Sequence, residues 1–420
     1  MTIPQIDKQH LTHDILERFL RYVKIDTQSD ETGSGKPTTP GQWNLLNLIQ
    51  AELKEAGISD IFINDDGFMI ARMPSNISGS QPPAIGFMAH VDTAGDMPGK
   101  NVKPQIITDY DGTDIRLGDS WLLRVDENPQ LLDWKGQSII TSDGTTLLGA
   151  DDKAGAAEIV AAAKYLAEHP DIRHGEVEFI FTCDEETGHG MDGFPLEQLH
   201  SACCYTLDGG KRGEIEYECF HAVKALITFT GVMYHPGSAR GRMVNAITMA
   251  ASFCGMLPQA ESPEATDGRY GYYYFHALSG DSEKCNLIVN LRDFEQKGME
   301  RRQQALQAAA EAVEFLYQGG IVSVEFEKQY ANMRSYIEKA PKVMQKLTAA
   351  VAELGIEPIL KPIRGGTDGS RLSEMGIPAP NIFAGGVNFH SRYEWAALPA
   401  MRDAALVILG LVRSWSTEQA

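Results

Sequence analysis

Histidine and acidic side chains follow five separate apolar runs of the sequence, in a pattern that suits metal chemistry. The runs lead into His90 and Asp92, Asp151 and Asp152, Asp184, Glu185 and Glu186, Asp208, and His390. Taken singly, each position has an ordinary structural explanation, such as a hydrogen-bonded core histidine, a turn residue or a helix cap. Acids that converge from several strands, however, need a cation to offset their repulsion. Five such strand ends therefore favour a metal centre.

The types of ligand narrow the choice of metal. Oxygen and imidazole donors without thiolate suit zinc, with manganese or cobalt as alternatives. Two histidines and three or four carboxylates exceed what one tetrahedral ion needs, and they fit two ions about 3.5–4 Å apart that share a carboxylate and a water. Such a pair would make that water a hydroxide near neutral pH, and a remaining carboxylate could accept its proton.

Alternating helix and strand signals surround these residues. Apolar residues at helical spacing predict helices over residues 11–25, 42–57, 153–170, 343–356 and 401–415. Short apolar runs predict strands over residues 83–92, 177–183, 204–207 and 381–384. This order is typical of an α/β fold with a mostly parallel sheet covered by helices on both faces. Functional groups in such folds gather beyond the carboxyl ends of the strands, where these histidines and acids fall.

The order of the predicted helices and strands changes between residues 218 and 331. Here the order of strand, helix, two strands, helix and strand is that of an α+β ferredoxin-like unit. We therefore expect a catalytic domain made of residues 1–217 and 332–420, with residues 218–331 inserted as a lid or dimerisation domain. A single large α/β domain is the alternative for a chain of 420 residues.

The bulk composition excludes several classes of partner. A formal net charge of −20 argues against binding to nucleic acid or to an anionic membrane surface, which requires basic patches. The N-terminus lacks a basic and apolar leader, and no stretch reaches the ~18 apolar residues of a membrane span. The six cysteines show no CxxC spacing and suit buried thiols. We expect a cytoplasmic protein.

Seven segments carry a resemblance to a known family. They are "MAHVDTAG", "LLGADDKAG", "TCDEETGHG", "YTLDGG", "YHPGSARGRMVNA", "LKPIRGGTDGSRLSEMGIPAPNIFAGG" and "NFHSRYE". In this order they resemble the peptidase T family of tripeptide aminopeptidases. These are co-catalytic dinuclear zinc exopeptidases, related to glutamate carboxypeptidases and N-acyl amino acid deacylases. The resemblance covers nearly the whole chain and includes the inserted domain.

The resemblance implies a role for each matching position. Two zinc ions per subunit would be held by five ligands: His90, Asp151, Glu186, Asp208 and His390. His90 and Asp208 would bind one ion, Glu186 and His390 the other, and Asp151 both. Glu185 would be the general base, and Asp92 would orient the His90 imidazole. Asp184 would point away, and the Asp151–Asp152 peptide bond would be cis, as is common in such sites.

Residues of the inserted domain, and Arg364 beyond it, would add substrate contacts. By the same resemblance, His235 would stabilise the oxyanion, acting from its own or a partner subunit, although a loop histidine before a turn is an equal alternative. Arg292 and Arg364 could pair with the terminal carboxylate of a peptide, unless they are solvated or structurally paired. Asn245 could face substrate or cap a helix. A homodimer through an exposed edge of this domain and a monomer with a mobile lid both stay open.

The expected activity is release of the N-terminal residue from short peptides, chiefly tripeptides. A related amidohydrolase is the alternative: a dipeptidase, a carboxypeptidase or a deacylase of N-acyl amino acids. A catalytically silent peptide-binding protein is disfavoured because the general base and all five ligand positions are present. The chain departs from the family at Cys183, where proline is common, and at His189, where lysine or arginine is usual. Neither departure removes a ligand.

Overall fold

The computed structural model describes residues 6–79 and 81–418. The chain divides into two compact units, each described by itself below. The first contains residues 1–217, 335–361 and 367–420, and the second contains residues 218–334 and 362–366. The return to the first unit thus falls three residues after the position expected from the sequence, and a short later segment clusters with the inserted unit.

The first unit is built on an eight-stranded sheet. Its strands, in spatial order, are β1 (Asp60–Ile63), β2 (Met69–Met73), β8 (Val177–Thr182), β3 (Ile85–His90), β9 (Cys203–Gly209), β16 (Asn381–Phe383), β10 (Glu214–Cys219) and β15 (Ile359–Ile363). The four central strands, β8, β3, β9 and β16, are parallel, whereas β1, β2 and β10 pair antiparallel with their neighbours. The expected α/β fold with a mostly parallel central sheet is confirmed.

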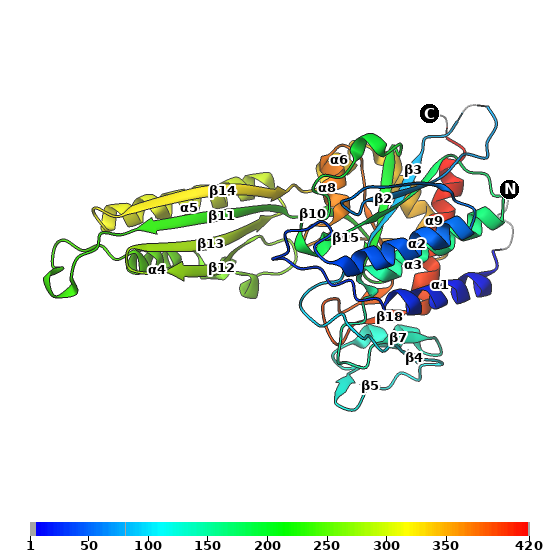
Figure 1. The fold of residues 1–420 in the computed structure, drawn as a ribbon, viewed down its shortest axis with the longest axis horizontal. Coiled ribbons are helices and arrows are strands. Elements are labelled where there is room, and N and C mark those ends of the chain that lie inside the picture. The colour runs from blue at the N-terminus through cyan, green and yellow to red at the C-terminus, as the bar shows by residue number, and fades with distance from the viewer. Residues whose placement is uncertain (1–5, 80, 419–420) are drawn as a thin grey trace. The chain divides into compact units, whose positions relative to one another are not determined.

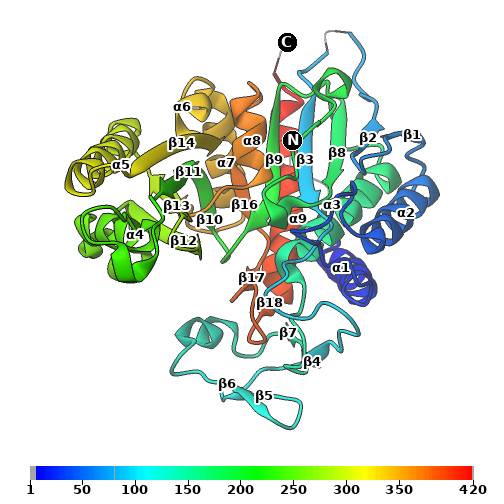
Figure 2. The same ribbon diagram turned by 60° about the vertical axis from the view of Figure 1, so that its left-hand side comes forward.

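Helices cover this sheet unequally. The long helices are α1 (Lys8–Tyr22), α2 (Pro40–Glu55), α3 (Ala150–Glu168), α7 (Pro341–Glu353) and α9 (Leu398–Trp415), which all contribute to the larger hydrophobic core. Figure 2 shows β8, β3 and β9 side by side with α3 and α9 next to them. The other face is packed against a smaller cluster that includes α8 (Asp368–Glu374) and the segment around Phe194.

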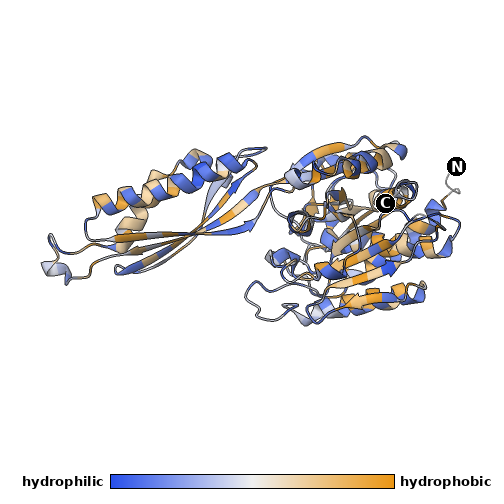
Figure 3. Ribbon diagram, turned by 90° about the horizontal axis from the view of Figure 1, so that it is seen from above, coloured by the Kyte–Doolittle hydropathy of each residue, from blue (hydrophilic) through white to orange (hydrophobic). Residues whose placement is uncertain are grey.

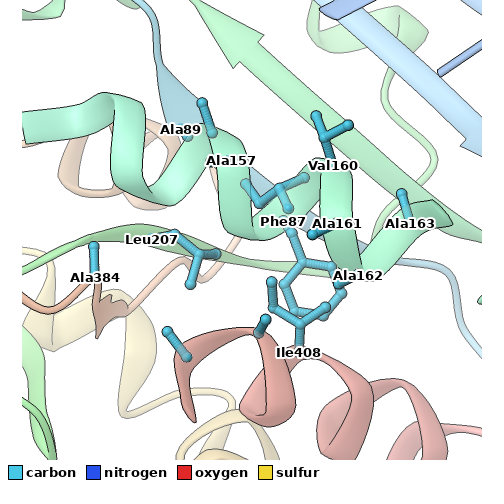
Figure 4. Close-up of a cluster of buried hydrophobic side chains, with 14 of the residues drawn as sticks. Phe87, Ala89, Ala157, Val160, Ala161, Ala162, Ala163, Leu207, Ala384 and Ile408 are labelled. Carbon is cyan, nitrogen blue, oxygen red and sulfur yellow. The ribbon is translucent and has the colours of Figure 1, made fainter. Parts of the chain in front are cut away.

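The alternation of side chains along β3 explains the two cores. Phe87 and Ala89 face the larger core, whereas Met88, between them, faces the smaller one. In Figure 4, Phe87 lies among alanines of α3, including Ala161, and Ile408 of α9. The small side chains of α3 allow this helix to pack closely against the sheet. The start of α3, with Asp151, lies at the carboxyl end of the central strands.

A further β-structure in the first unit was not predicted. One four-stranded sheet has the order β17 (Gly386–Val387), β18 (Trp395–Ala397), β7 (Ile139–Thr141) and β4 (Gln105–Ile107), and β5 (Ile115–Leu117) pairs with β6 (Trp121–Leu123). Trp395 is fully buried in its core. The chain between β17 and β18 forms the turn that carries His390.

The second unit matches the expected ferredoxin-like order. Its elements are β11 (His221–Thr230), α4 (Ala246–Met256), β12 (Tyr272–Gly280), β13 (Lys284–Asp293), α5 (Gln296–Leu316) and β14 (Ile321–Tyr330), labelled in Figure 1. The sheet is antiparallel, in the order β12-β13-β11-β14. Hydrophobic and hydrophilic positions alternate along the helices (Figure 3), because one side of each helix packs on a sheet.

Among the described residues, no helix is long and apolar enough to cross a membrane. All six cysteines carry free thiols, and five of them are buried.

Candidate active site

The expected metal ligands of the first unit meet at the carboxyl end of the central strands of its sheet. His90 is the last residue of β3, Asp208 lies near the end of β9, and Glu186 follows β8. These three strands are parallel neighbours, so their carboxyl ends lie together. Asp151, in the first turn of α3, and His390, in the turn before β18, complete the group.

Asp151 lies between the two histidines. Its Oδ1 is 3.0 Å from Nε2 of His90, and its Oδ2 is 3.4 Å from Nε2 of His390. Each carboxylate oxygen thus faces one imidazole, which is the arrangement that a bridging ligand requires. The peptide bond between Asp151 and Asp152 is cis.

On the His90 side, two further acids approach the imidazole. Oδ1 of Asp208 is 3.8 Å from Nε2 of His90. Asp152 could also be grouped with this pair. Its two oxygens, however, accept the backbone N–H groups of His90 at 3.3 Å and Gly155 at 3.2 Å. The Asp152 carboxylate therefore binds backbone N–H groups, which leaves Asp151 and Asp208 as the acids facing Nε2 of His90.

On the His390 side, Glu186 is the near acid. Its Oε2 is 2.9 Å from Nε2 of His390. Its other oxygen, Oε1, is buried and has no hydrogen-bond partner among the described residues. Nδ1 of His390 is 3.1 Å from Oδ2 of Asp96. An orphaned carboxylate oxygen beside an imidazole Nε2 is what a metal-binding position looks like without its ion.

The three acids after β8 have different surroundings. The Asp184 carboxylate turns away from the histidines and accepts hydrogen bonds from the backbone N–H of Thr38 and from the Gln42 amide. The backbone N–H groups of Glu185 and Glu186 both donate to Asp92, each at 3.1 Å. Asp184 itself has a φ of 61°, a left-handed conformation uncommon for a residue other than glycine, and this turns the chain sharply. The contacts thus separate Asp184, whose carboxylate is engaged by Thr38 and Gln42, from Glu185 and Glu186, whose roles stay predictions.

Burial and charge shift the ionisation of these groups. Hydrogen bonds to Asp151 and Glu186 raise the pKa of His390 to about 11. Burial would lower the pKa of His90, but Asp151, Asp208 and Asp92 raise it well above its usual value. Without a metal ion, the acids thus hold both imidazoles protonated. A metal ion would replace these protons, because an imidazole binds metal in its neutral form.

The pKa values of the acids are shifted in opposite directions. Burial raises the pKa of Glu186 to about 7 and, together with the charge of Asp151, that of Asp208 to about 6. Burial acts on Asp151 too, but His390 and His90 hold its pKa well below its usual value. Asp151 is therefore the firmly ionised carboxylate of the cluster. The set of nitrogen and oxygen donors without sulfur fits two zinc ions, or manganese or cobalt.

Three residues near the cluster had no role in the sequence-based prediction. Asp96 contacts His390, Asp368 accepts the Thr182 hydroxyl at 2.5 Å, and Glu394 accepts the backbone N–H of Asp151 at 3.1 Å. Asp368 lies in the "GGTDG" segment, and Glu394 ends "NFHSRYE". Their position in a motif was the only available signal.

The remaining predicted residues lie in the second unit. His235 is exposed, and its Nδ1 accepts the Gly237 N–H at 3.2 Å. Asn245 caps α4, accepting the Ile247 N–H at 2.9 Å. Arg292 lies over the Tyr330 ring, at 5.6 Å from its centroid.

Arg364 has a clear structural use. Its Nη1 donates to the carbonyls of Gly268 and Tyr270, and its Nη2 donates to Thr266. Both terminal nitrogens are thus engaged with the backbone of the second unit. These contacts favour a structural role for Arg364, one of the two alternatives expected from the sequence, over binding of a substrate carboxylate.

Comparisons with known proteins agree on the family. The profile of Peptidase family M20/M25/M40 matches residues 134–414. Peptidase T of Clostridium perfringens is 46% identical over 400 residues, which cover 95% of this chain and 98% of that protein. Peptidase T of Bacillus velezensis is 45% identical over 405 residues, covering 96% and 98%.

Solved structures share the fold. The crystal structure of aminopeptidase PepT from Bacillus cereus gives a TM-score of 0.75 at 23% identity and covers 97% of this chain and 99% of its own. A dinuclear metal binding peptidase from the M20 family of Bacillus subtilis gives 0.64 at 14% identity, covering 97% and 98%. The full-length identity to the curated relatives, together with the family profile, shows that the chain belongs to peptidase family M20/M25/M40, in its peptidase T group.

Proposed function

We propose that this chain is a dinuclear zinc aminopeptidase that releases the N-terminal residue from tripeptides. The observation that carries the proposal is the position of Asp151, which turns one carboxylate oxygen to each of two imidazoles. The curated relatives of similar length, named Peptidase T, supply the substrate class. The other amidohydrolase activities weighed from the sequence are not favoured by these relatives.

Five residues would hold the metals. His90 and Asp208 would bind one ion, Glu186 and His390 the other, and Asp151 would join them. Bound divalent ions would polarise the scissile carbonyl and supply a reactive water near neutral pH. Zinc is the expected ion, with manganese or cobalt as substitutes.

Glu185 would act as general base. It follows Asp184 directly and is fixed by the hydrogen bond from its N–H to Asp92. Burial raises the pKa of its carboxyl well above the usual value. A carboxylate with a raised pKa can take the proton of the attacking water and keep it until the leaving amine needs it.

A cleft beside the cluster suits the free amino end of a peptide. It has a volume of about 980 Å³ within the first unit and reaches Glu186 and His390. Its other charged lining residues are Asp26, Asp30, Glu31, Asp96 and Lys100. This acidic lining attracts the N-terminal ammonium of an unmodified peptide and repels a C-terminal carboxylate. Recognition of the amino end therefore favours an aminopeptidase over a carboxypeptidase or deacylase.

Three residues of the second unit are proposed to contact substrate. We keep His235 as the residue that would stabilise the oxyanion, from its own or a partner subunit, and Arg292 as a partner for the peptide carboxylate. Asn245 is the weaker candidate because its side chain already caps α4. We also propose that this unit serves as a lid or as a dimerisation domain, which would allow a homodimer. The proposed location of the protein is the cytoplasm.

An activity panel tests the proposal. Di-, tri- and tetrapeptides would be assayed with free and acetylated N-termini, before and after chelation. We expect turnover of free tripeptides that chelation abolishes and zinc restores, with acetylated tripeptides inert. Equal cleavage of acetylated and free peptides would reject the aminopeptidase assignment in favour of a deacylase or carboxypeptidase.

A further inference from the structure

Glu394 is a buried carboxylate that the proposed ligand set does not use. It is only 1% exposed and lies four residues after His390, immediately before β18. Its Oε2 accepts the backbone N–H groups of Leu148 at 2.7 Å and Gly149 at 2.8 Å. Its Oε1 accepts that of Asp151 at 3.1 Å. One carboxylate thus accepts three backbone N–H groups within residues 148–151, the segment that carries the expected bridging acid.

The segment needs such a partner. Gly149 precedes the first residue of α3 and has a φ of 82°, while the backbone of Asp151 and Asp152 is not yet helical. Backbone N–H groups at a helix start lack partners within the helix and attract a negative charge. Glu394 satisfies these donors from a distant part of the chain. The direction of the Asp151 side chain is therefore set by a contact outside α3.

The turn that carries Glu394 is also braced internally. The N–H of Glu394 donates to the Ser391 carbonyl at 3.1 Å, and the Asn388 amide donates to the Tyr393 carbonyl at 3.1 Å. His390 lies within this turn, with a left-handed φ of 59°. A displacement of the Glu394 carboxylate would thus change the positions of both His390 and Asp151.

We propose that Glu394 is a positioning residue that fixes Asp151 relative to His390, so that the metal position between them and Glu186 reaches its full affinity only when both Glu394 oxygens accept. The inference depends on the proposed metal sites but not on the peptide that is cleaved. It predicts a metal-binding defect in a protein that keeps all five ligands.

The test uses Glu394→Gln, which keeps the volume but replaces one acceptor oxygen by a donor NH2 group. In the metal-free protein, amide hydrogen exchange at Leu148, Gly149 and Asp151 should become faster than in the wild type. On titration with zinc, or with cobalt followed by its absorption spectrum, one of the two equivalents should bind about 10–100-fold more weakly. Glu394→Asp keeps two acceptors on a shorter arm and should restore part of this affinity. It also carries the test if the glutamine variant does not fold.

A matched control is available in Glu178. It is buried as completely as Glu394 and accepts the N–H groups of His200 and Ser201, but it lies near the start of β8, while the metal cluster lies beyond the strand's end. Glu178→Gln should lose stability and still bind both equivalents normally. Wild-type binding of both equivalents by both Glu394 variants would overturn the proposal. Failure of the wild type to cleave tripeptides would reject the proposed function and leave this result standing.

Discussion

Asp92 accepts a hydrogen bond from the backbone N–H of Glu185, at 3.1 Å between Oδ1 and the nitrogen. Its Oδ2 accepts the N–H of Glu186 at the same distance, and its Oδ1 lies 3.3 Å from Nδ1 of His90. Asp92 is fully buried. A single carboxylate therefore joins the end of β3 to the acid run after β8, and the positions of one histidine ligand and of the expected base depend on each other.

This relationship predicts the effect of Asp92→Ala. Removing the carboxylate leaves two partly buried N–H groups without this acceptor and frees the His90 ring, so zinc affinity should fall about 10–100-fold and turnover should fall with it. Metal content after dialysis and kcat on a tripeptide would measure both effects. Adding excess zinc should recover only part of the activity, because Glu185 would stay misplaced. Full recovery at high zinc would mean that Asp92 acts on the metal alone.

Glu185→Gln separates chemistry from metal binding. The amide cannot accept the proton of the attacking water, so kcat should fall about 10²–10⁴-fold while metal content stays near two ions per chain. Steady-state kinetics and elemental analysis of the same preparation give the two values. Glu197→Gln, at an exposed glutamate, is the control and should keep full activity. Unchanged kcat in Glu185→Gln would remove this residue from the proposed mechanism.

The metal-free protein should lose stability as the pH rises. The pKa values of Glu186 and Asp208 are raised in the folded state to about 7 and about 6, so folding is favoured by their protonation. Their contribution to stability falls as the pH rises from the unfolded values, 4.5 and 3.8, through these folded values. His390 acts in the same direction, because its pKa of about 11 gives stability that is complete only below its unfolded value of 6.5. Asp151, with its lowered pKa, is ionised throughout.

Thermal unfolding between pH 5 and pH 8 would measure this effect. The melting temperature of metal-free protein should fall across the window. Each acid passes through about one or two pKa units of its shift there, so the free energy of unfolding should fall by a few kcal/mol in total. Zinc-loaded protein should show a much flatter profile, since the ions neutralise the cluster and bind only the folded state. Parallel profiles with and without zinc would contradict the electrostatic account of the site.

The convergence of the expected ligands at the strand ends was predictable, whereas the residues that contact them from elsewhere in the chain were not. His90, Asp208 and Glu186 follow apolar runs, and the carboxyl ends of parallel strands meet at one edge, so pattern alone brings them together. Glu394 binds backbone N–H groups, which give no signal in the sequence of the partner segment. Asp96 is separated from His390 by most of the chain.

The small sheet beside His390 was missed for a different reason. Its strands have only two or three residues each, which is too short for alternation to show. The turn geometry at His390, with its left-handed φ, also has no signature in a histidine. The inserted unit, by contrast, has strands of nine and ten residues and long amphipathic helices, and its order of elements was predicted correctly.

Glu158, which is not one of the expected metal ligands, allows a test of how burial of a carboxylate affects stability. It lies in α3, is fully buried, and neither carboxylate oxygen has a hydrogen-bond partner among the described residues. Burial raises its pKa well above the usual 4.5. The ionisation of such a group costs little below pH 4.5 and destabilises the fold increasingly as the pH rises from there to the folded pKa, by about 1.4 kcal/mol per pKa unit.

Glu158→Gln should therefore raise the melting temperature of metal-free protein at pH 8, relative to the wild type, and leave it nearly unchanged at pH 4.5. The amide still loses hydrogen bonds to water on burial, but it has no charge to desolvate. Unfolding curves at both pH values for wild type, Glu158→Gln and the exposed control Glu197→Gln would isolate the effect. Equal shifts of Glu158→Gln at the two pH values would show that ionisation of Glu158 does not limit stability, because only an ionisable group makes the difference depend on pH.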